Sequence, residues 1–216
     1  MTPRDKLLAE IRRDFADTAN WTGRPEVSPR VFAALAAVAR EAYVPPAEAP
    51  YAYINAPLPI GHRQTISQPY IVAIMTELLD LAGTESVLEI GTGSGYQAAI
   101  LARLVPKVFT VEVIPELAEQ ARANLRSQGV ANVEVRTGDG NDGWPEHAPY
   151  DAIIVTAAAA ELPPALVAQL KPGGRMVIPL GRAGGAQDLV VVEKTATGAL
   201  RRNTVLPVAF VPLVRA

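Results

Sequence analysis

The feature that most restricts the fold lies between residues 87 and 112, where two short apolar runs flank a glycine-rich turn and a helical segment. The first run is Val-Leu-Glu-Ile, the turn is Gly-Thr-Gly-Ser-Gly, and the second run ends in Glu112. Glycines allow a sharp turn and let a ligand approach the backbone where a Cβ atom would clash. An acid that closes the second strand of such a unit accepts hydrogen bonds from ribose hydroxyls. The sequence therefore predicts a strand over 87–90, a helix over 95–104, a strand over 108–113 and a bound adenosine-type cofactor.

The spacing of the glycines separates the candidate cofactors. A dinucleotide fingerprint has its third glycine at the sixth position, whereas here Tyr96 stands at that position and the third glycine is Gly95. No Gly-Lys-Ser/Thr triplet follows, so the turn is not a P-loop. The run Glu-Ile-Gly-Thr-Gly-Ser-Gly resembles the first motif of S-adenosylmethionine (SAM) methyltransferases. This resemblance implies that Glu89 and loop amides meet the amino-acid portion of SAM; the alternative is a tight turn without a ligand.

The composition excludes several other classes of protein. The 216 residues are 49% hydrophobic and 19% charged, which predicts a folded domain with its own core. A net charge of −2 with scattered Lys and Arg argues against nucleic-acid binding, and no apolar stretch reaches membrane-spanning length. The chain has no cysteine and two histidines, so disulfides, thiolate metal sites and a cysteine nucleophile are excluded. Because the N-terminus also lacks a signal-peptide core, we expect a cytoplasmic enzyme without a metal ion or a membrane partner.

The rest of the chain predicts alternating helices and strands. Helices are expected within residues 1–44, including Val31–Arg40, and over 69–81, 115–128 and 163–170, with a proline-rich loop over 45–66. Strands are expected over 132–136, 150–155, 175–180, 188–195 and 204–213, with a turn at 171–174. This alternation is typical of an α/β, Rossmann-like fold, with a mostly parallel sheet, helices on both faces and an antiparallel edge. We expect a single domain over 1–216, in which 1–84 form a helical and substrate-loop extension and 85–216 the core.

Four polar residues fall at the ends of predicted strands, namely Glu89, Glu112, Asp139 and Thr156. Ligands of open α/β sheets bind at the carboxyl ends of the strands, so we expect these residues along one rim. Asp139 is placed to accept from an adenine amino group, with the neighbouring amides reaching ring nitrogens. The alternatives are structural, because Glu112 is also suited to capping the helix that begins at Pro115, and Asp139 to an ordinary turn.

A second constellation covers Pro57–Tyr70, with the sequence Pro-Leu-Pro-Ile-Gly-His-Arg-Gln-Thr-Ile-Ser-Gln-Pro-Tyr. By composition it predicts a loop that enters a helix, in which Ser67 caps the helix and His62 is a solvated loop residue. The run also resembles the signature of protein-L-isoaspartate O-methyltransferases. Further segments that are similar to this family follow in order between residues 28 and 214: Val87–Ala99, Gly138–Gly140, Gly143–Pro145, Tyr150–Ala158, Leu170–Arg175, Ile178–Gly181 and Pro207–Leu213.

This resemblance implies a SAM-dependent carboxyl methyltransferase. In the family a Thr-x-Ser segment covers the cofactor and reaches the substrate carboxylate, which assigns catalysis to Ser67 and Thr65. The implied acceptor is the free carboxylate of isoaspartyl residues in peptides and damaged proteins, whose methylation initiates repair, and we expect a monomer. The cofactor-binding residues that the motifs and the resemblance imply are Ile66, Ser67, Glu89, Gly91, Thr92, Gly93, Ser94, Glu112, Val113, Asp139, Gly140 and Thr156.

The chain departs from the family pattern on the substrate side. Arg63 stands where the family usually has glycine, Ile54 where it often has an acid, and Val38–Glu41 where a Val-Pro-Arg-His-type segment is usual. If the position of Arg63 requires a positive φ, the arginine must strain or reshape its loop. Two alternatives stay open: a methyltransferase of the same fold with another acceptor, and a SAM-binding protein without turnover. An NAD-dependent oxidoreductase is more distant because of Tyr96.

Overall fold

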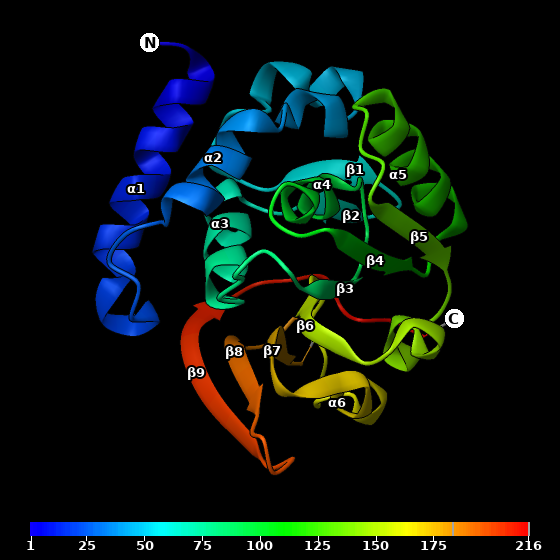
Figure 1. The fold of residues 1–216 in the computed structure, drawn as a ribbon. Coiled ribbons are helices and arrows are strands. Elements are labelled where there is room, and N and C mark those ends of the chain that lie inside the picture. Colours follow the sequence, from blue (N-terminus) through cyan, green and yellow to red (C-terminus); the bar gives the residue numbers. More distant parts are fainter. Residues whose placement is uncertain (183, 216) are drawn as a thin grey trace.

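The computed structural model describes residues 1–182 and 184–215, which contain a central sheet of seven strands (Figure 1). The order across the sheet is β5-β4-β3-β6-β7-β8-β9. The strands are β3 (Ser86–Ile90), β4 (Lys107–Glu112), β5 (Val133–Thr137), β6 (Tyr150–Val155), β7 (Leu170–Gly181), β8 (Gln187–Lys194) and β9 (Leu200–Val208). Neighbours from β5 to β7 pair in parallel, whereas β8 and β9 add antiparallel pairs. The predicted α/β fold with an antiparallel edge is confirmed.

The sheet separates two apolar cores, because successive side chains of a strand point to opposite faces. In β3, Val87 belongs to one core, whereas Leu88 and Ile90 belong to the other. The first core is covered by α1 (Pro3–Thr22), α2 (Pro29–Ala37), α3 (Pro69–Leu78), α4 (Tyr96–Ala102) and α5 (Pro115–Ser127), and the second by α6 (Pro164–Gln169). Figure 1 shows α6 on the opposite side of the sheet from α4 and α5. Burial on both faces explains why the central strands are continuous apolar runs.

The segment between α2 and α3 is more ordered than predicted. Instead of an open loop over 45–66, it contains the short 3-10 helices η1 (Arg40–Tyr43) and η2 (Pro46–Tyr51) and a hairpin of β1 (Leu58–Gly61) and β2 (Gln64–Ile66). The helix predicted over Val31–Arg40 ends at Ala37, and the one predicted over 69–81 ends at Leu78. The loop prediction was wrong because proline and glycine mark turns without showing that the residues between them pair.

The C-terminal part also differs from the prediction. Residues 171–174 lie within β7 and not in a separate turn, although the register of β7 against β6 shifts there. The last strand was predicted over 204–213, but β9 ends at Val208. The chain then leaves the sheet, and the Val211 carbonyl accepts from Ala158 N at 2.8 Å. Figure 1 shows this red segment running back across the molecule toward the side of β5. Pro212 has no N–H to donate, which disfavours a longer strand.

Two short 3-10 helices, η3 (Gly140–Asp142) and η4 (Pro145–His147), lie between β5 and β6. Asp139 is the N-cap residue of η3, so the turn interpretation of this aspartate holds at the level of local structure. Gly140, the next residue, packs so closely on β3 that a Cβ atom there would lie 2.5 Å from Cγ2 of Ile90. The segment after β5 therefore lies over the end of β3.

Candidate active site

The glycine-rich turn after β3 packs directly against Thr156 at the end of β6. Gly91 has a φ of 92°, and a Cβ atom at this position would lie 2.4 Å from Oγ1 of Thr156. The Thr156 hydroxyl donates to the Gly91 carbonyl at 2.7 Å. The backbone conformation and the close approach of Thr156 each require glycine at position 91.

Glu112 connects the glycine-rich turn with the start of α5. The side chain is buried, and its carboxylate accepts from Gly93 N at 2.8 Å and from Ile114 N at 3.1 Å. The contact with Ile114, the N-cap residue of α5, retains part of the capping interpretation. An ionised carboxylate has about four lone-pair sites, so the two amides leave capacity for ribose hydroxyls. Glu112 is thus both a fixed part of the turn and an available acceptor.

The hairpin β1–β2 lies over the same turn. A Cβ atom at Gly93 would lie 3.3 Å from Cδ1 of Ile60, so hairpin and turn are in contact. Ser67 follows the hairpin directly and is half-buried. The interpretation of Ser67 as a helix cap was wrong, because Gln68 is the N-cap residue of α3, and the first-turn amide of Tyr70 donates to Oδ1 of Asn55 at 3.1 Å. The hydroxyl of Ser67 makes no hydrogen bond with the described part of the chain.

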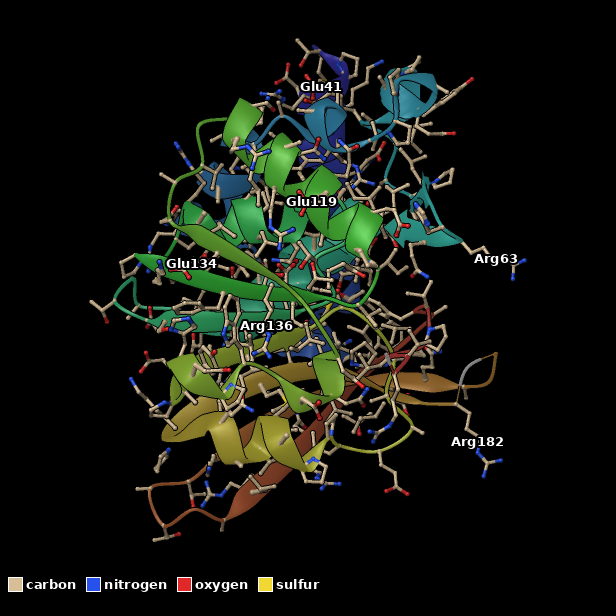
Figure 2. All side chains as sticks on the ribbon, turned by 90° about the vertical axis from the view of Figure 1, so that its right-hand side faces the viewer. Glu41, Arg63, Glu119, Glu134, Arg136 and Arg182 are labelled. Atoms are coloured by element: carbon tan, nitrogen blue, oxygen red, sulfur yellow. The ribbon has the colours of Figure 1, made fainter. Side chains whose placement is uncertain are left out.

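The turn of the hairpin carries Arg63, the main departure from the family pattern. His62 has a φ of 50° and Arg63 a φ of 58°, both in the left-handed region. Glycine adopts this conformation without strain, whereas a residue with a Cβ atom, such as Arg63, loses about 1–2 kcal/mol there. Both residues are exposed, as expected for His62, and Figure 2 shows Arg63 extending away from the body of the molecule. The strain is confined to the tip of the hairpin.

Three hollows meet beside the hairpin. A cleft of about 550 Å³ lies between the glycine-rich turn, Glu112 and the segment 211–214. A groove of about 1000 Å³ lies between Pro57, Ser67 and the segment 207–211. An inner hollow of about 340 Å³ lies between Ser67 and the glycine-rich turn. Thr65 and Thr156 line all three spaces, and Ser67 lines the groove and the inner hollow.

Most of the predicted cofactor-binding residues line these spaces. The cleft is lined by Gly91, Gly93, Glu112, Val113, Gly140 and Thr156, and the inner hollow by Ile66, Ser67, Gly91, Thr92, Ser94 and Thr156. Asp139 stands beside the cleft, where its Oδ1 accepts from Asn141 N and Asn141 Nδ2 at 2.8 Å. Its neighbour Gly140 lines the cleft, so the chain after β5 reaches the site through Gly140.

Glu89 does not lie on the rim with Glu112 and Thr156, contrary to the sequence prediction. It points to the same face of β3 as Val87, because side chains alternate along a strand, and it is fully buried. Neither carboxylate oxygen has a partner with hydrogen-bond geometry among the described residues. Burial raises the pKa of Glu89 to about 8; the nearby Thr110 hydroxyl opposes this shift and the charge of Glu112 adds to it. Glu89 is therefore protonated at neutral pH.

Sequence reasoning missed two parts of the site. The segment Val211–Val214 lines the cleft, but the strand predicted over 204–213 took in all of it except Val214. Arg40 contacts Ser67 from behind, because its Nη1 donates to the Ser67 carbonyl at 2.8 Å. No local pattern signalled this contact, because Arg40 is followed directly by Glu41 and the pair looks like an ordinary exposed charged turn.

The residues present fit an adenosine-type cofactor. The cleft offers a fixed carboxylate and partly exposed glycine backbone. It also lies where ligands of open parallel sheets bind, at the carboxyl ends of β3, β4 and β6. In the described part of the chain, no group of three or more His, Asp or Glu side chains is placed to hold a metal ion. The fold and this site define a SAM-dependent methyltransferase.

Comparison with known proteins identifies the family. The model of the protein-L-isoaspartate(D-aspartate) O-methyltransferase family matches residues 22–216. A protein-L-isoaspartate O-methyltransferase 2 from Syntrophobacter fumaroxidans is 55% identical over 97% of this chain and 85% of its own length. One from a Polaromonas species is 54% identical over 96% of this chain and 98% of its own length. The chain belongs to the protein-L-isoaspartate(D-aspartate) O-methyltransferase family.

Two solved structures share the fold of this chain. A protein-L-isoaspartate O-methyltransferase superposes with a TM-score of 0.83 at 30% identity, and the match covers 97% of this chain and 65% of that one. A structure from Plasmodium falciparum, named for the same activity and containing S-adenosyl-L-homocysteine, has a TM-score of 0.82 at 23% identity, with both chains fully covered. The resemblance drawn from the motifs and the predicted cofactor, SAM, are confirmed, and the oxidoreductase alternative was wrong.

Proposed function

We propose that this chain methylates the free carboxylate of isoaspartyl residues in peptides and proteins at the point where the three hollows meet. The observation that carries the proposal is that Thr65 and Thr156 line all three spaces and Ser67 lines two. A cofactor in the cleft and an acceptor in the groove then share a boundary of only a few side chains. Methyl transfer needs such a boundary, because the acceptor oxygen, the methyl carbon and the sulfur must be in line at near-attack distance.

The chemistry asks little of the protein beyond orientation. The α-carboxyl group of an isoaspartyl residue has an ordinary pKa of about 3.3–3.7, so it is already ionised at neutral pH and needs no general base. When bound, SAM supplies a methyl group made electrophilic by the adjacent sulfonium. The chain must therefore hold the acceptor carboxylate still, exclude water from it and leave one of its oxygens free to attack.

Ser67 is suited to orienting the acceptor. Its hydroxyl is at the boundary of the groove and has no hydrogen-bond partner among the described residues, so it is available to donate to one carboxylate oxygen. A single neutral donor fixes the direction of the carboxylate without deeply stabilising the anion before the reaction. Glu112 and the glycine-rich turn hold the other reactant, since the carboxylate of Glu112 is available to both ribose hydroxyls.

The product of this reaction is a methyl ester, in which the isoaspartyl linkage is not yet repaired. The neighbouring main-chain nitrogen attacks the ester carbonyl and expels methanol, which closes a succinimide ring. Water then opens the ring, in part to normal aspartate. The chain initiates repair by creating the better leaving group, and it takes no part in the later steps.

The proposal is tested with purified protein, SAM and two peptides that differ only in having isoaspartate or aspartate at one position. Mass spectrometry should detect a base-labile methyl ester on the isoaspartyl peptide and none on the aspartyl peptide. Ester on neither peptide, with SAM still bound in calorimetry, would reject the proposed acceptor and favour another carboxylate in the same groove. Ester on both would show that the groove does not distinguish the two linkages.

Other expectations from the sequence stay predictions. A single domain over 1–216, a monomer and a cytoplasmic location are each open to direct measurement, the first two by unfolding and light scattering. In the described part of the chain, no helix is both long and apolar enough to cross a membrane.

A further inference from the structure

Arg40 is a fully buried arginine that has no acidic partner among the described residues. It begins η1 and has no exposed surface. Its guanidinium lies 5.2 Å from the centre of the Tyr96 ring. Burial lowers the pKa of Arg40 to about 10, which still leaves the side chain protonated at neutral pH. A buried charge without a counter-ion is costly, so its hydrogen bonds must provide compensation.

The hydrogen bonds of Arg40 reach both ends of the hairpin that covers the glycine-rich turn. Nη1 donates to the carbonyl of Ser67 at 2.8 Å, and Nη2 donates to the carbonyl of Ala56 at 3.2 Å. Ala56 lies just before β1 and Ser67 directly after β2, so the two acceptors flank the hairpin Leu58–Ile66. The planar guanidinium presents its donors in a rigid fork, which suits it to fixing two carbonyls at once.

We propose that Arg40 is a positioning residue that clamps the base of the β1–β2 hairpin and thereby holds Ser67 at the boundary of the groove. The clamp rests on the proposed function in assigning Ser67 to the acceptor. Residues of the hairpin and its base line each of the three hollows, including Thr65 in all of them and Pro57 in the groove. Arg40 itself lines none of these three spaces, so it acts on the reaction only through the chain that it holds.

Two substitutions separate the parts of this proposal. Arg40→Lys keeps the charge but replaces the fork with one ammonium group, and Arg40→Met removes both the charge and the hydrogen bonds while retaining much of the apolar stem. Loss of two charge-assisted hydrogen bonds that orient a reacting group should lower kcat/KM for the isoaspartyl peptide by about 10- to 100-fold. The affinity for SAM should change by a smaller factor than kcat/KM for the peptide, because the cleft keeps Glu112 and the glycine-rich turn. Arg40→Lys should retain more activity than Arg40→Met.

Arg30 provides a matched control. Its guanidinium also bridges two main-chain carbonyls, those of Leu81 and Leu104, at 2.7 and 2.9 Å. It is exposed and lines none of the three hollows. Arg30→Met should therefore lower the melting temperature without a selective loss of peptide turnover. This comparison distinguishes the effect of losing any arginine that bridges two carbonyls from the effect of losing the bridge that Arg40 makes at the base of the hairpin.

Hydrogen exchange gives a readout that does not depend on turnover. The amides of residues 58–67 should exchange at least about ten-fold faster in both Arg40 variants, while the amides of β3, β4 and β6 keep their protection. Unchanged exchange in the hairpin together with unchanged kcat/KM would overturn the proposal, and so would a loss shared equally by the whole sheet. If Arg40→Met does not fold, Arg40→Lys decides alone by the same two measurements. If the wild-type protein makes no ester, the proposed acceptor fails, yet the exchange data still decide whether Arg40 clamps the hairpin.

Discussion

Replacing Glu89 by glutamine is expected to stabilise the protein at neutral pH. Glu89 is fully buried, its oxygens have no partner with hydrogen-bond geometry among the described residues, and its pKa is raised from 4.5 to about 8. At a pH between these two pKa values, Glu89 has lost its proton in the unfolded chain but keeps it in the folded chain. Folding therefore requires proton uptake, and the free energy of unfolding falls as the pH rises through this window.

The magnitude follows from the width of the window. Each pH unit between the two pKa values removes about 1.4 kcal/mol, so the wild-type protein has lost about 3 kcal/mol at pH 7 relative to acid conditions in which both states are protonated. Glutamine has the same shape and no proton to release. The stability of Glu89→Gln minus that of the wild type should therefore grow by about 1.4 kcal/mol per pH unit between about pH 5.5 and 7.5.

The assay is urea denaturation of both proteins, without cofactor, at several pH values in that range. Glu119→Gln, on the exposed face of α5 (Figure 2), gives the baseline for removing a carboxylate at the surface. Using the difference between variants cancels the titration of all other groups. If the free energies of unfolding of the wild type and of Glu89→Gln stay parallel as the pH changes through this range, the reasoning is refuted. Glu89 would then ionise in the folded protein as it does in the unfolded chain.

Three further predictions concern the cofactor and the acceptor. Ser67→Ala should lower methyl transfer by about ten-fold or more through loss of one oriented donor, with SAM affinity nearly intact; unchanged turnover in a steady-state assay would exclude a catalytic role. Glu112→Ala should weaken SAM binding by about ten-fold or more in calorimetry, because charge-assisted hydrogen bonds are lost, whereas Glu119→Ala should bind normally. Gly91→Ala should lower the free energy of unfolding by about 1–2 kcal/mol through the positive φ alone. The added Cβ atom would also clash with Thr156 Oγ1 at 2.4 Å, so this variant should bind SAM poorly. A normal melting temperature and a normal SAM affinity would contradict the close packing of the turn on the end of β6.

The parallel core could be predicted from the sequence because its signals are local. The apolar runs of β3, β4 and β6 are buried on both faces, and the glycines between Gly91 and Gly95 punctuate the first strand-to-helix connection. The same reasoning found Glu112 and Thr156, since residues at the carboxyl ends of parallel strands share one rim.

Other parts of the site depend on contacts that no local pattern encodes. Glu89 was expected on the rim, but strand alternation turns its side chain into the interior, and sequence alone did not show what covers that face. Arg40 donates across 27 residues to Ser67, a pairing that depends on how the hairpin folds back. The segment after Val208 has the apolar composition of a strand, and its course over the cleft is set by contacts with Ala158 and Gln187.

The most direct test of the proposed reaction geometry is a crystal structure of the protein with S-adenosyl-L-homocysteine and an isoaspartyl peptide. We expect the nucleoside in the cleft, with its ribose hydroxyls on Glu112, and the free carboxylate of the peptide in the groove within hydrogen-bond distance of Ser67 Oγ. A peptide carboxylate bound away from Ser67, or a nucleoside outside the cleft, would contradict the claim that the two reactants meet at Thr65, Ser67 and Thr156.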